Sequence, residues 1–192
     1  RDLHSFPTRR SSDLRREDLY GVLNGVDYDY WNPETDPLIP AHYSTEDLSG
    51  KAVCKRELQR EFWLKENPHI PVVGLVCRFT EQKGLHILAN VIRSIVQNMA
   101  VQFVFSGKGE KWLEDFFGGL PAEFPGKIGA WIGHEERKTH LIAAGSDFFL
   151  MPSLYEPCGL GQVYSMRYGS LPVVRVTRSE ERRVGKECRS RW

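Results

Sequence analysis

Two cationic side chains follow the short apolar run 71–77, in the segment Arg78-Phe-Thr-Glu-Gln-Lys83-Gly84. Arginine offers a planar fork of donors and lysine a compact point charge, and together they suit the oxygens of a diphosphate. Gly84 allows the chain to turn into the next element. The spacing predicts a phosphate-binding loop. The alternative is that Arg78 and Lys83 are two solvated surface cations.

An acidic residue and a glycine-rich turn follow a second apolar run, in the segment Met151-Pro-Ser-Leu-Tyr-Glu156-Pro-Cys158-Gly159-Leu160-Gly161-Gln162. Backbone N–H groups at the start of a helix favour an anion. Glu156 would then face the group attached to that anion, for example through hydrogen bonds to sugar hydroxyls. The alternative is an ordinary turn in which the carboxylate caps a helix.

The elements that must position these residues alternate between apolar runs and segments of helical period. Runs that are apolar throughout are typical of parallel strands covered on both faces. The alternation predicts right-handed βαβ units and a Rossmann-like, doubly wound parallel α/β sheet. Ligands bind outside the carboxyl ends of such strands. Strands are predicted at 71–77, 101–105, 127–132, 148–151 and 171–176, helices at about 85–95, 112–117, 135–144 and 159–168, and ligand-facing loops at 78–84, 106–109, 133–136 and 152–160.

Two further local patterns accompany these elements. Gly145 is predicted just past the end of the helix at 135–144, where glycine is favoured. Upstream, Ser44-Thr-Glu-Asp47 resembles a capping box and predicts a helix with Cys54, Leu58 and Phe62 on one face. Residues 21–40 are rich in Asn, Asp, Pro and Gly, and are interpreted as an ordered linker and not as a core element.

Composition excludes several classes of function. The 192 residues carry 26 Lys and Arg against 25 Asp and Glu, so no global positive field would hold nucleic acid or an anionic membrane. No apolar run reaches the roughly 18 residues of a membrane span, and residues 1–16 lack a signal-peptide core. The four cysteines form no C-x-x-C pair, which argues against zinc and indicates a reducing, cytoplasmic compartment.

The two ends differ from the middle of the chain. Residues 1–14 and 178–192 are rich in Arg, lack any period and hold little apolar surface to offset the entropy of ordering. They resemble translated sequencing-adapter read-through, so we interpret both as foreign tails of a truncated coding region and exclude them from fold reasoning. The alternative is a pair of basic arms that bind phosphate.

Four blocks of sequence, in order, resemble one family. They are GVLNGVDYDYWNPETDP, CRFTEQKGL, AAGSDFFLMPS and PSLYEPCGLGQVYSMRYGSLPVVRVT. Together they are similar to the bacterial glycogen synthases and plant starch synthases, glycosyltransferase family five, over residues 19–177. The resemblance implies the C-terminal Rossmann-like half of a two-domain GT-B enzyme, with residues 15–43 as interdomain segment and 44–177 as a truncated nucleotide-sugar-binding domain.

The resemblance also implies an activity and partners. Such enzymes transfer glucose from ADP-glucose to the non-reducing end of an α-1,4-glucan, with retention of the anomeric configuration. The partners would be the nucleotide sugar, the glucan and a missing N-terminal domain of the same bacterial, cytoplasmic enzyme. We therefore expect the isolated chain to bind the donor weakly and to be inactive in transfer, because half a cleft cannot exclude water or align the substrates.

Residue roles carry over from the matched motifs. Arg78 and Lys83 match the pair on the diphosphate, and Glu156 matches the essential carboxylate beside the donor glucose. The phosphate-facing turn and a linker asparagine near the sugar correspond to Cys158, Gly159, Leu160 and Asn24. The family implies no cofactor and no metal, and Asp27-Tyr28-Asp29 is a superficial metal-motif likeness within the interdomain segment. Cys158 is interpreted as a packing residue, with a reactive thiol as the alternative.

Departures from the family keep other readings open. His134 stands where the family usually has an aromatic residue, often tyrosine, that stacks on the nucleobase, which makes the base preference less secure. The family pattern stops at Thr177, as truncation requires. The alternatives are another GT-B glycosyltransferase that uses a UDP-sugar, and a non-catalytic nucleotide-binding α/β module.

Overall fold

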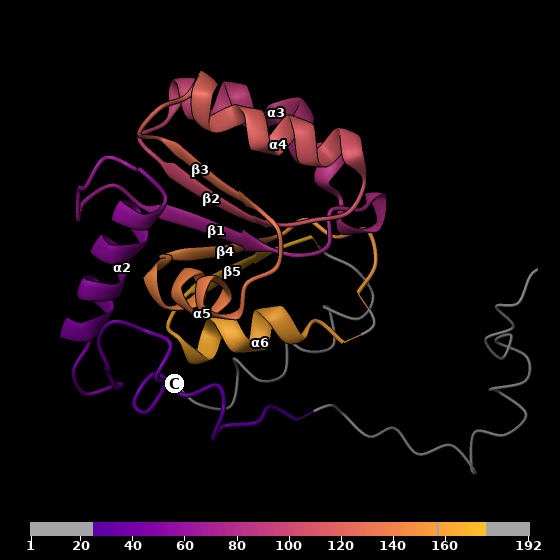
Figure 1. Ribbon diagram of the computed structural model, residues 1–192. Coiled ribbons are helices and arrows are strands. Elements are labelled where there is room, and N and C mark those ends of the chain that lie inside the picture. Colours follow the sequence, from indigo (N-terminus) through magenta and orange to yellow (C-terminus); the bar gives the residue numbers. More distant parts are fainter. Residues whose placement is uncertain (1–24, 157, 176–192) are drawn as a thin grey trace, which may run out of the picture.

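Runs of Val, Phe and Leu form the strands of one parallel sheet in the computed structural model, which describes residues 25–156 and 158–175 (Figure 1). The strands lie in the order β3-β2-β1-β4-β5. Their bounds are β1 Val72–Val76, β2 Gln102–Gly107, β3 Ile128–Ile132, β4 Phe148–Met151 and β5 Leu171–Val174. The predicted Rossmann-like, doubly wound α/β fold is confirmed, and every predicted strand end lies within two residues of the observed end.

Helices cover both faces of the sheet (Figure 1). The chain runs outward from β1 to β3 through α3 (Leu85–Asn98) and α4 (Lys111–Glu123), which lie on one face. It then returns to β4 and β5 through α5 (Glu136–Gly145) and α6 (Leu160–Arg167) on the other face. Right-handed crossovers require this exchange of faces when the direction of strand addition reverses. The remaining helix, α2 (Ser49–Glu61), packs against α5.

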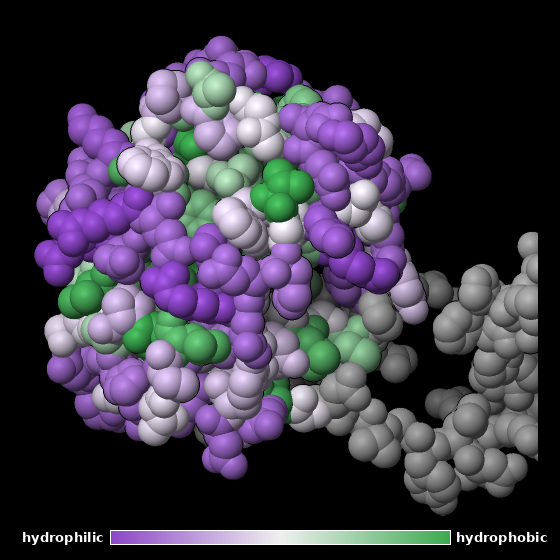
Figure 2. Space-filling view, viewed as in Figure 1, coloured by the Kyte–Doolittle hydropathy of each residue, from purple (hydrophilic) through white to green (hydrophobic). Residues whose placement is uncertain are grey.

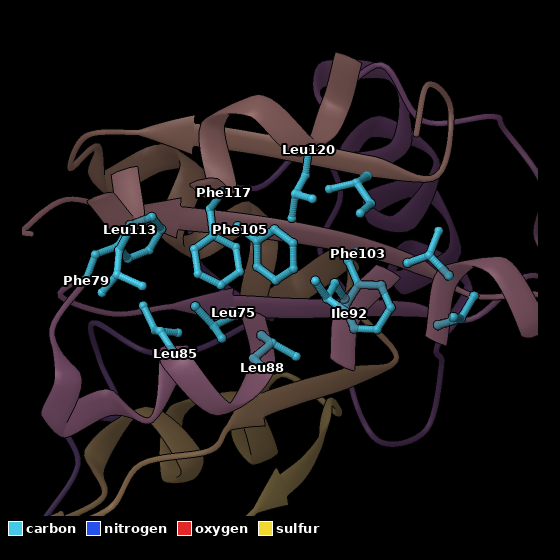
Figure 3. Packing of buried hydrophobic residues seen from close by; sticks show 13 residues of the cluster. Leu75, Phe79, Leu85, Leu88, Ile92, Phe103, Phe105, Leu113, Phe117 and Leu120 are labelled. Carbon is cyan, nitrogen blue, oxygen red and sulfur yellow. The ribbon is translucent and has the colours of Figure 1, made fainter. Parts of the chain in front are cut away.

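The core beneath α3 and α4 is rich in phenylalanine. Figure 3 shows Phe79, Phe105 and Phe117 between the sheet and these helices. The ring centroids of Phe105 and Phe117 lie 4.8 Å apart, and those of Phe79 and Phe117 lie 5.5 Å apart. Every residue of β2 is buried because this strand has neighbours on both edges and helices on both faces. Phe79 extends this core to the first loop of the predicted site.

The core on the other face of the sheet depends on a close approach of α2 and α5. Gly145 was predicted just past the end of α5, and this is wrong, because α5 includes Gly145 and its C-cap is Ser146. A Cβ at this position would lie 2.7 Å from the Cys54 carbonyl oxygen and 2.8 Å from the Leu58 Cβ. Glycine is therefore required by the contact with α2 and not by a left-handed backbone.

The predicted capping box does not open a helix. The Ser44 hydroxyl accepts hydrogen bonds from the backbone N–H groups of Glu46 and Asp47, which closes a local turn. The helix begins at Ser49, whose N–H donates to the Asp47 carboxylate at 2.9 Å. The predicted helical face is confirmed, because Cys54, Leu58 and Phe62 are all buried.

The predicted linker is ordered over residues 25–40, but the expectation that it lies outside the core is wrong. Asp36 is 2% exposed, and its Oδ2 lies 2.7 Å from His140 Nδ1 and accepts a 2.5 Å hydrogen bond from the Tyr168 hydroxyl. Trp31 stacks between His140 and Tyr164, with centroid separations of 4.1 and 4.2 Å. These contacts fasten the linker to α5 and α6, which composition alone did not reveal.

The helices of the described ranges 25–156 and 158–175 are all too short or too polar to cross a lipid bilayer. Hydrophilic residues predominate on the face that Figure 2 draws.

The Asp36 carboxylate should make the stability of the chain depend on pH. Burial alone would raise the pKa of Asp36, but hydrogen bonds from His140 and Tyr168 outweigh it and hold this pKa below its usual 3.8. A lowered folded-state pKa stabilises the fold above pH 3.8, and this stabilisation is lost as the pH falls through the folded-state pKa. Asp36→Asn should lower the unfolding free energy by about 2 kcal/mol at pH 7, and the difference should shrink at acid pH.

Urea unfolding of both chains between neutral pH and pH 3 measures this difference, with the exposed Asp29→Asn as the matched control. A difference that stays constant with pH would contradict a stabilising role for the Asp36 charge.

Candidate active site

The site lies where the direction of strand addition reverses. Strands β1 and β4 are neighbours, yet β1 leads away to β2 and β4 leads away to β5. The chain leaves β1 toward α3 on one face of the sheet and leaves β4 toward α6 on the other face. Doubly wound proteins bind ligands in the crevice at such a point. The two loops that the sequence singled out, 78–84 and 152–160, are the two that follow β1 and β4.

A buried aromatic side chain holds the first loop. Phe79 is fully buried, and its N–H donates to the Lys108 carbonyl oxygen at 2.9 Å. Its own carbonyl oxygen accepts a 2.7 Å hydrogen bond from Glu110 N. This anchor extends β1 by one further contact with the loop after β2. The backbone of the neighbouring Arg78 is therefore held in place, while Arg78 itself is exposed.

The two loops are joined to each other through Gln82. Its carbonyl oxygen accepts a 2.9 Å hydrogen bond from Leu154 N, and its side-chain amide donates to the Tyr155 carbonyl oxygen at 3.2 Å. Gly84 follows with φ +69°, and a Cβ there would lie 2.0 Å from the Pro152 carbonyl oxygen. The absence of a side chain thus permits both the left-handed backbone and the approach of the loops.

This approach pairs the two residues that were predicted from separate motifs. Lys83 Nζ lies 2.6 Å from Glu156 Oε1, with side chains 17% and 10% exposed. The Ser153 hydroxyl donates to the same oxygen, also at 2.6 Å. Glu156 is therefore held by a cation from one loop and a hydroxyl from its own loop. Charge-assisted hydrogen bonds of this kind are among the strongest in proteins.

A cavity of about 310 Å³ opens beside this pair. It is lined by both loops, by the ends of β1 and β4 and by the first residues of α6. Six of the predicted site residues share this lining: Arg78, Lys83, Glu156, Cys158, Gly159 and Leu160. The structure therefore brings the cationic loop and the acidic loop to one space.

The start of α6 contributes backbone groups to the same cavity. Gly159 has φ +61° and immediately precedes the helix, which begins at Leu160. The first N–H groups of a helix lack partners within it and carry a partial positive charge. Two cationic side chains and a helix start thus surround one cavity, an arrangement suited to a diphosphate.

The sequence did not reveal the roles of some residues in and around the cavity. Ser153 and Gln82 lie within the motifs, but nothing in the spacing showed that they hold Glu156 or join the loops. Cys77 also lines the cavity, although it belongs to neither of the two motifs. Burial raises the pKa of Cys77 to about 12, so the thiol stays neutral at pH 7 despite the nearby Lys83.

One predicted site residue of the described ranges lies away from this cluster. His134 is exposed in the loop after β3, two strands away from β1, and is not among the residues that line the cavity. Asn24 lies outside the described residues.

The superficial metal motif forms a turn. Asp27 Oδ1 accepts hydrogen bonds from the N–H groups of Asp29 and Tyr30, at 3.0 and 3.1 Å. Within residues 25–156 and 158–175, His, Cys, Asp and Glu side chains form no group of three or more that could hold a metal ion.

Fold and site together define a Rossmann-like α/β domain in which two cationic residues and one acidic residue line the same cavity. The family model described as "Glycosyl transferases group 1" matches residues 70–186. The chain belongs to this family of glycosyltransferases.

Within this family, the chain is similar to bacterial glycogen synthases. The chain is 53% identical over 163 residues to glycogen synthase 1 of Geobacter metallireducens and 51% identical over 164 residues to glycogen synthase of Thermosipho africanus. Each match covers 85% of this chain but only 32% and 34% of the relative, respectively. The chain therefore spans about a third of the length of these relatives. The predicted resemblance to glycogen synthases is confirmed.

Solved structures agree with the fold. The catalytic domain of starch synthase IV from Arabidopsis thaliana, solved with ADP and acarbose bound, matches with a TM-score of 0.82 and 34% identity, over 90% of this chain and 36% of that one. Anabaena HepE, solved with UDP and glucose, matches with a TM-score of 0.55 and 19% identity, over 83% of this chain and 38% of that one, which supports the fold alone.

Gly84 provides a direct test of how the site is assembled. Gly84→Ala would place a Cβ against the Pro152 carbonyl and force a left-handed alanine, so it should lower the unfolding free energy by about 2–4 kcal/mol. Gly119→Ala is the matched control, because nothing lies within 4 Å of the added Cβ and the residue is within α4. The control should raise the unfolding free energy by up to about 1 kcal/mol.

Chemical denaturation of the three chains measures both effects. Equal stabilities of Gly84→Ala and the wild type would show that the loops do not depend on this close approach.

Proposed function

We propose that this chain is the donor-binding part of a glycogen or starch synthase. The longer enzyme would transfer glucose from ADP-glucose to the non-reducing end of an α-1,4-glucan, with retention of configuration. The observation that carries the proposal is the shared cavity, in which Arg78 and Lys83 from one loop meet Glu156 from the other. Identities near 50% to glycogen synthases support the polymer as acceptor.

Each charged residue has a distinct part in the proposed reaction. Negative charge develops on the diphosphate as the bond to glucose breaks, and Arg78, Lys83 and the start of α6 would stabilise it. Glu156 would lie beside the transferred glucose, oriented by the Ser153 hydroxyl. Because these positive groups would themselves balance the charge of the leaving diphosphate, we propose that the reaction uses no metal ion and no cofactor.

ADP-glucose is the donor that we favour over a UDP-sugar. The support comes from the starch synthase solved with ADP, which is 34% identical to this chain, whereas the neighbour solved with UDP is only 19% identical. His134 follows β3, at the same edge of the sheet as the cavity. It would contact the base if the nucleotide extends from the cavity toward β3.

The proposed catalysis needs more protein than this chain supplies. Its length is about a third of that of the relatives, and the cavity is a crevice at the surface of one domain. Transfer requires that acceptor and donor be held in line and that water be excluded. We infer that an N-terminal domain closes over this cavity in the full enzyme.

Arg78 should be essential for affinity toward the donor. Arg78→Ala removes a charge-assisted contact worth about 1.5–3 kcal/mol, so it should weaken ADP binding roughly tenfold to a hundredfold. Calorimetric titration of the 192-residue chain with ADP and with UDP measures this loss and the base preference. Arg93→Ala is the control, because Arg93 pairs with Glu123 on the outer surface of α3 and α4. Unchanged ADP affinity of Arg78→Ala would contradict the assigned role.

Glu156 should be essential for turnover. In a full-length enzyme that contains these residues, Glu156→Gln should lower kcat by a factor of about a thousand or more, while ADP affinity changes little. The exposed Glu66→Gln is a matched control. Retained glucan elongation in Glu156→Gln would favour the non-catalytic nucleotide-binding module.

A further inference from the structure

A second cavity, of about 460 Å³, lies at the outer edge of the sheet. It opens between the end of α2, the segment that connects α4 to β3, and the edge strand β3. It shares no lining residue with the active-site cavity. Figure 2 shows white to green surface over β3, between the hydrophilic surfaces of the neighbouring helices. The aromatic and proline residues of its lining are Phe62, Trp63, Pro121, Pro125 and Trp131.

Trp63 is unusual in two independent respects. The residue is 88% exposed, so its indole gains almost nothing from the fold. Its backbone has φ +55°, the left-handed region that a bulky residue rarely adopts.

The backbone around Trp63 explains why this conformation occurs. Trp63 N donates to the Arg60 carbonyl oxygen, and Leu64 N donates to the Gln59 carbonyl oxygen at 2.8 Å. These two hydrogen bonds form the Schellman motif that ends many helices, and Trp63 occupies the position where glycine is usual. The fold would be more stable with glycine here. A strained and exposed tryptophan therefore points to a role outside the fold.

Trp131 presents a second aromatic ring to the same cavity. It lies on β3 and is 41% exposed, and Lys138 Nζ lies 4.5 Å from the centre of its ring. The neighbouring Gly129 lets β3 press against the end of α2, since a Cβ there would lie 2.6 Å from the Phe62 Cβ. This contact brings the strand that carries Trp131 close to the helix end that carries Trp63.

Polar groups at the cavity are already held in place. Lys138 Nζ lies 2.9 Å from Glu61 Oε1 and 2.8 Å from Glu135 Oε2. Glu61 also pairs with Arg137 at 2.6 Å. The charges are therefore balanced locally, which suits a neutral ligand with many hydroxyl groups better than an ion. A pyranose ring presents apolar C–H groups to an aromatic face, while its hydroxyls hydrogen-bond at the rim.

We propose that the cavity between Trp63 and Trp131 binds an α-1,4-glucan chain, as a second carbohydrate site separate from the transfer site. The proposal rests on the proposed function, because that function makes the glucan the polymer that this protein meets. A glucan held at the surface raises the local concentration of chain ends near the transfer site. The class of ligand is a neutral α-linked oligosaccharide.

The experiment is a titration of the 192-residue chain with maltoheptaose, followed by the amide and indole N–H signals in NMR spectra. The expected result is saturable binding that shifts the indole signals of Trp63 and Trp131. Trp63→Gly should weaken this binding roughly tenfold or more. The same variant should raise Tm by about 2–4 °C because it relieves the left-handed strain. Trp63→Phe should keep most of the affinity, since it retains an aromatic face.

Trp112→Ala is the matched control. Trp112 is 48% exposed on α4 and does not line the cavity, so maltoheptaose affinity should be unchanged. Cellohexaose, which has β-1,4 links, should bind more weakly than maltoheptaose. Equal affinity for both sugars would overturn the assignment to an α-1,4-glucan.

The remaining outcomes also decide the proposal. Wild-type affinity in Trp63→Gly would place the sugar elsewhere and overturn this site. Absence of maltoheptaose binding, with a dimer that depends on Trp63 in sedimentation, would assign the cavity to a protein contact and overturn the proposal. If the chain binds ADP through Arg78 but does not bind maltoheptaose, the second site fails while the proposed function stands. If maltoheptaose binds but ADP does not, the donor assignment fails instead.

Discussion

The close approach of two loop backbones at Gly84 and Pro152 sets the distance between Lys83 and Glu156. A side chain at Gly84 would occupy the space of the Pro152 carbonyl oxygen, so the contact exists only with glycine. The hydrogen bonds between Gln82 and the second loop also hold the two loops together. A residue that carries no functional group thus controls the geometry of the two that do.

The sheet makes this contact possible because β1 and β4 are adjacent and parallel. Both loops leave the same edge of the sheet, and α3 and α6 then depart on opposite faces. The linker reinforces one side of this arrangement. Asp36 joins His140 on α5 to Tyr168 at the end of α6, and α6 is the helix whose first residues line the active-site cavity. A segment that precedes the domain therefore also braces the helix that starts at the site.

Sequence patterns predicted what depends on local chemistry. Apolar runs located the strands, and the residue types at strand ends located Arg78, Lys83 and Glu156 at one cavity. Patterns failed where contacts between distant segments decide the outcome. A glycine near position 145 is typical of a helix end. The structure shows that glycine is needed there because the Cys54 backbone, distant in sequence, lies too close for a side chain, and no local pattern reveals this contact. The burial of Asp36 could not be predicted for the same reason, because its hydrogen-bond partners lie more than 100 residues away in the sequence.

Glu156 has two hydrogen-bond donors, Lys83 and Ser153, and the second donor matters for the proposed role of Lys83. In the proposed function Lys83 must stabilise a diphosphate, yet it forms a short ion pair with the carboxylate. A carboxylate that loses its only partner in a largely buried place is strongly disfavoured. Glu156 does not depend on Lys83 alone, because the Ser153 hydroxyl donates to the same oxygen. When Lys83 turns toward an arriving diphosphate, Ser153 can keep the carboxylate oriented toward the sugar. In the proposed reaction, the ammonium group can then act on the leaving group while the Ser153 hydroxyl still holds the Glu156 carboxylate.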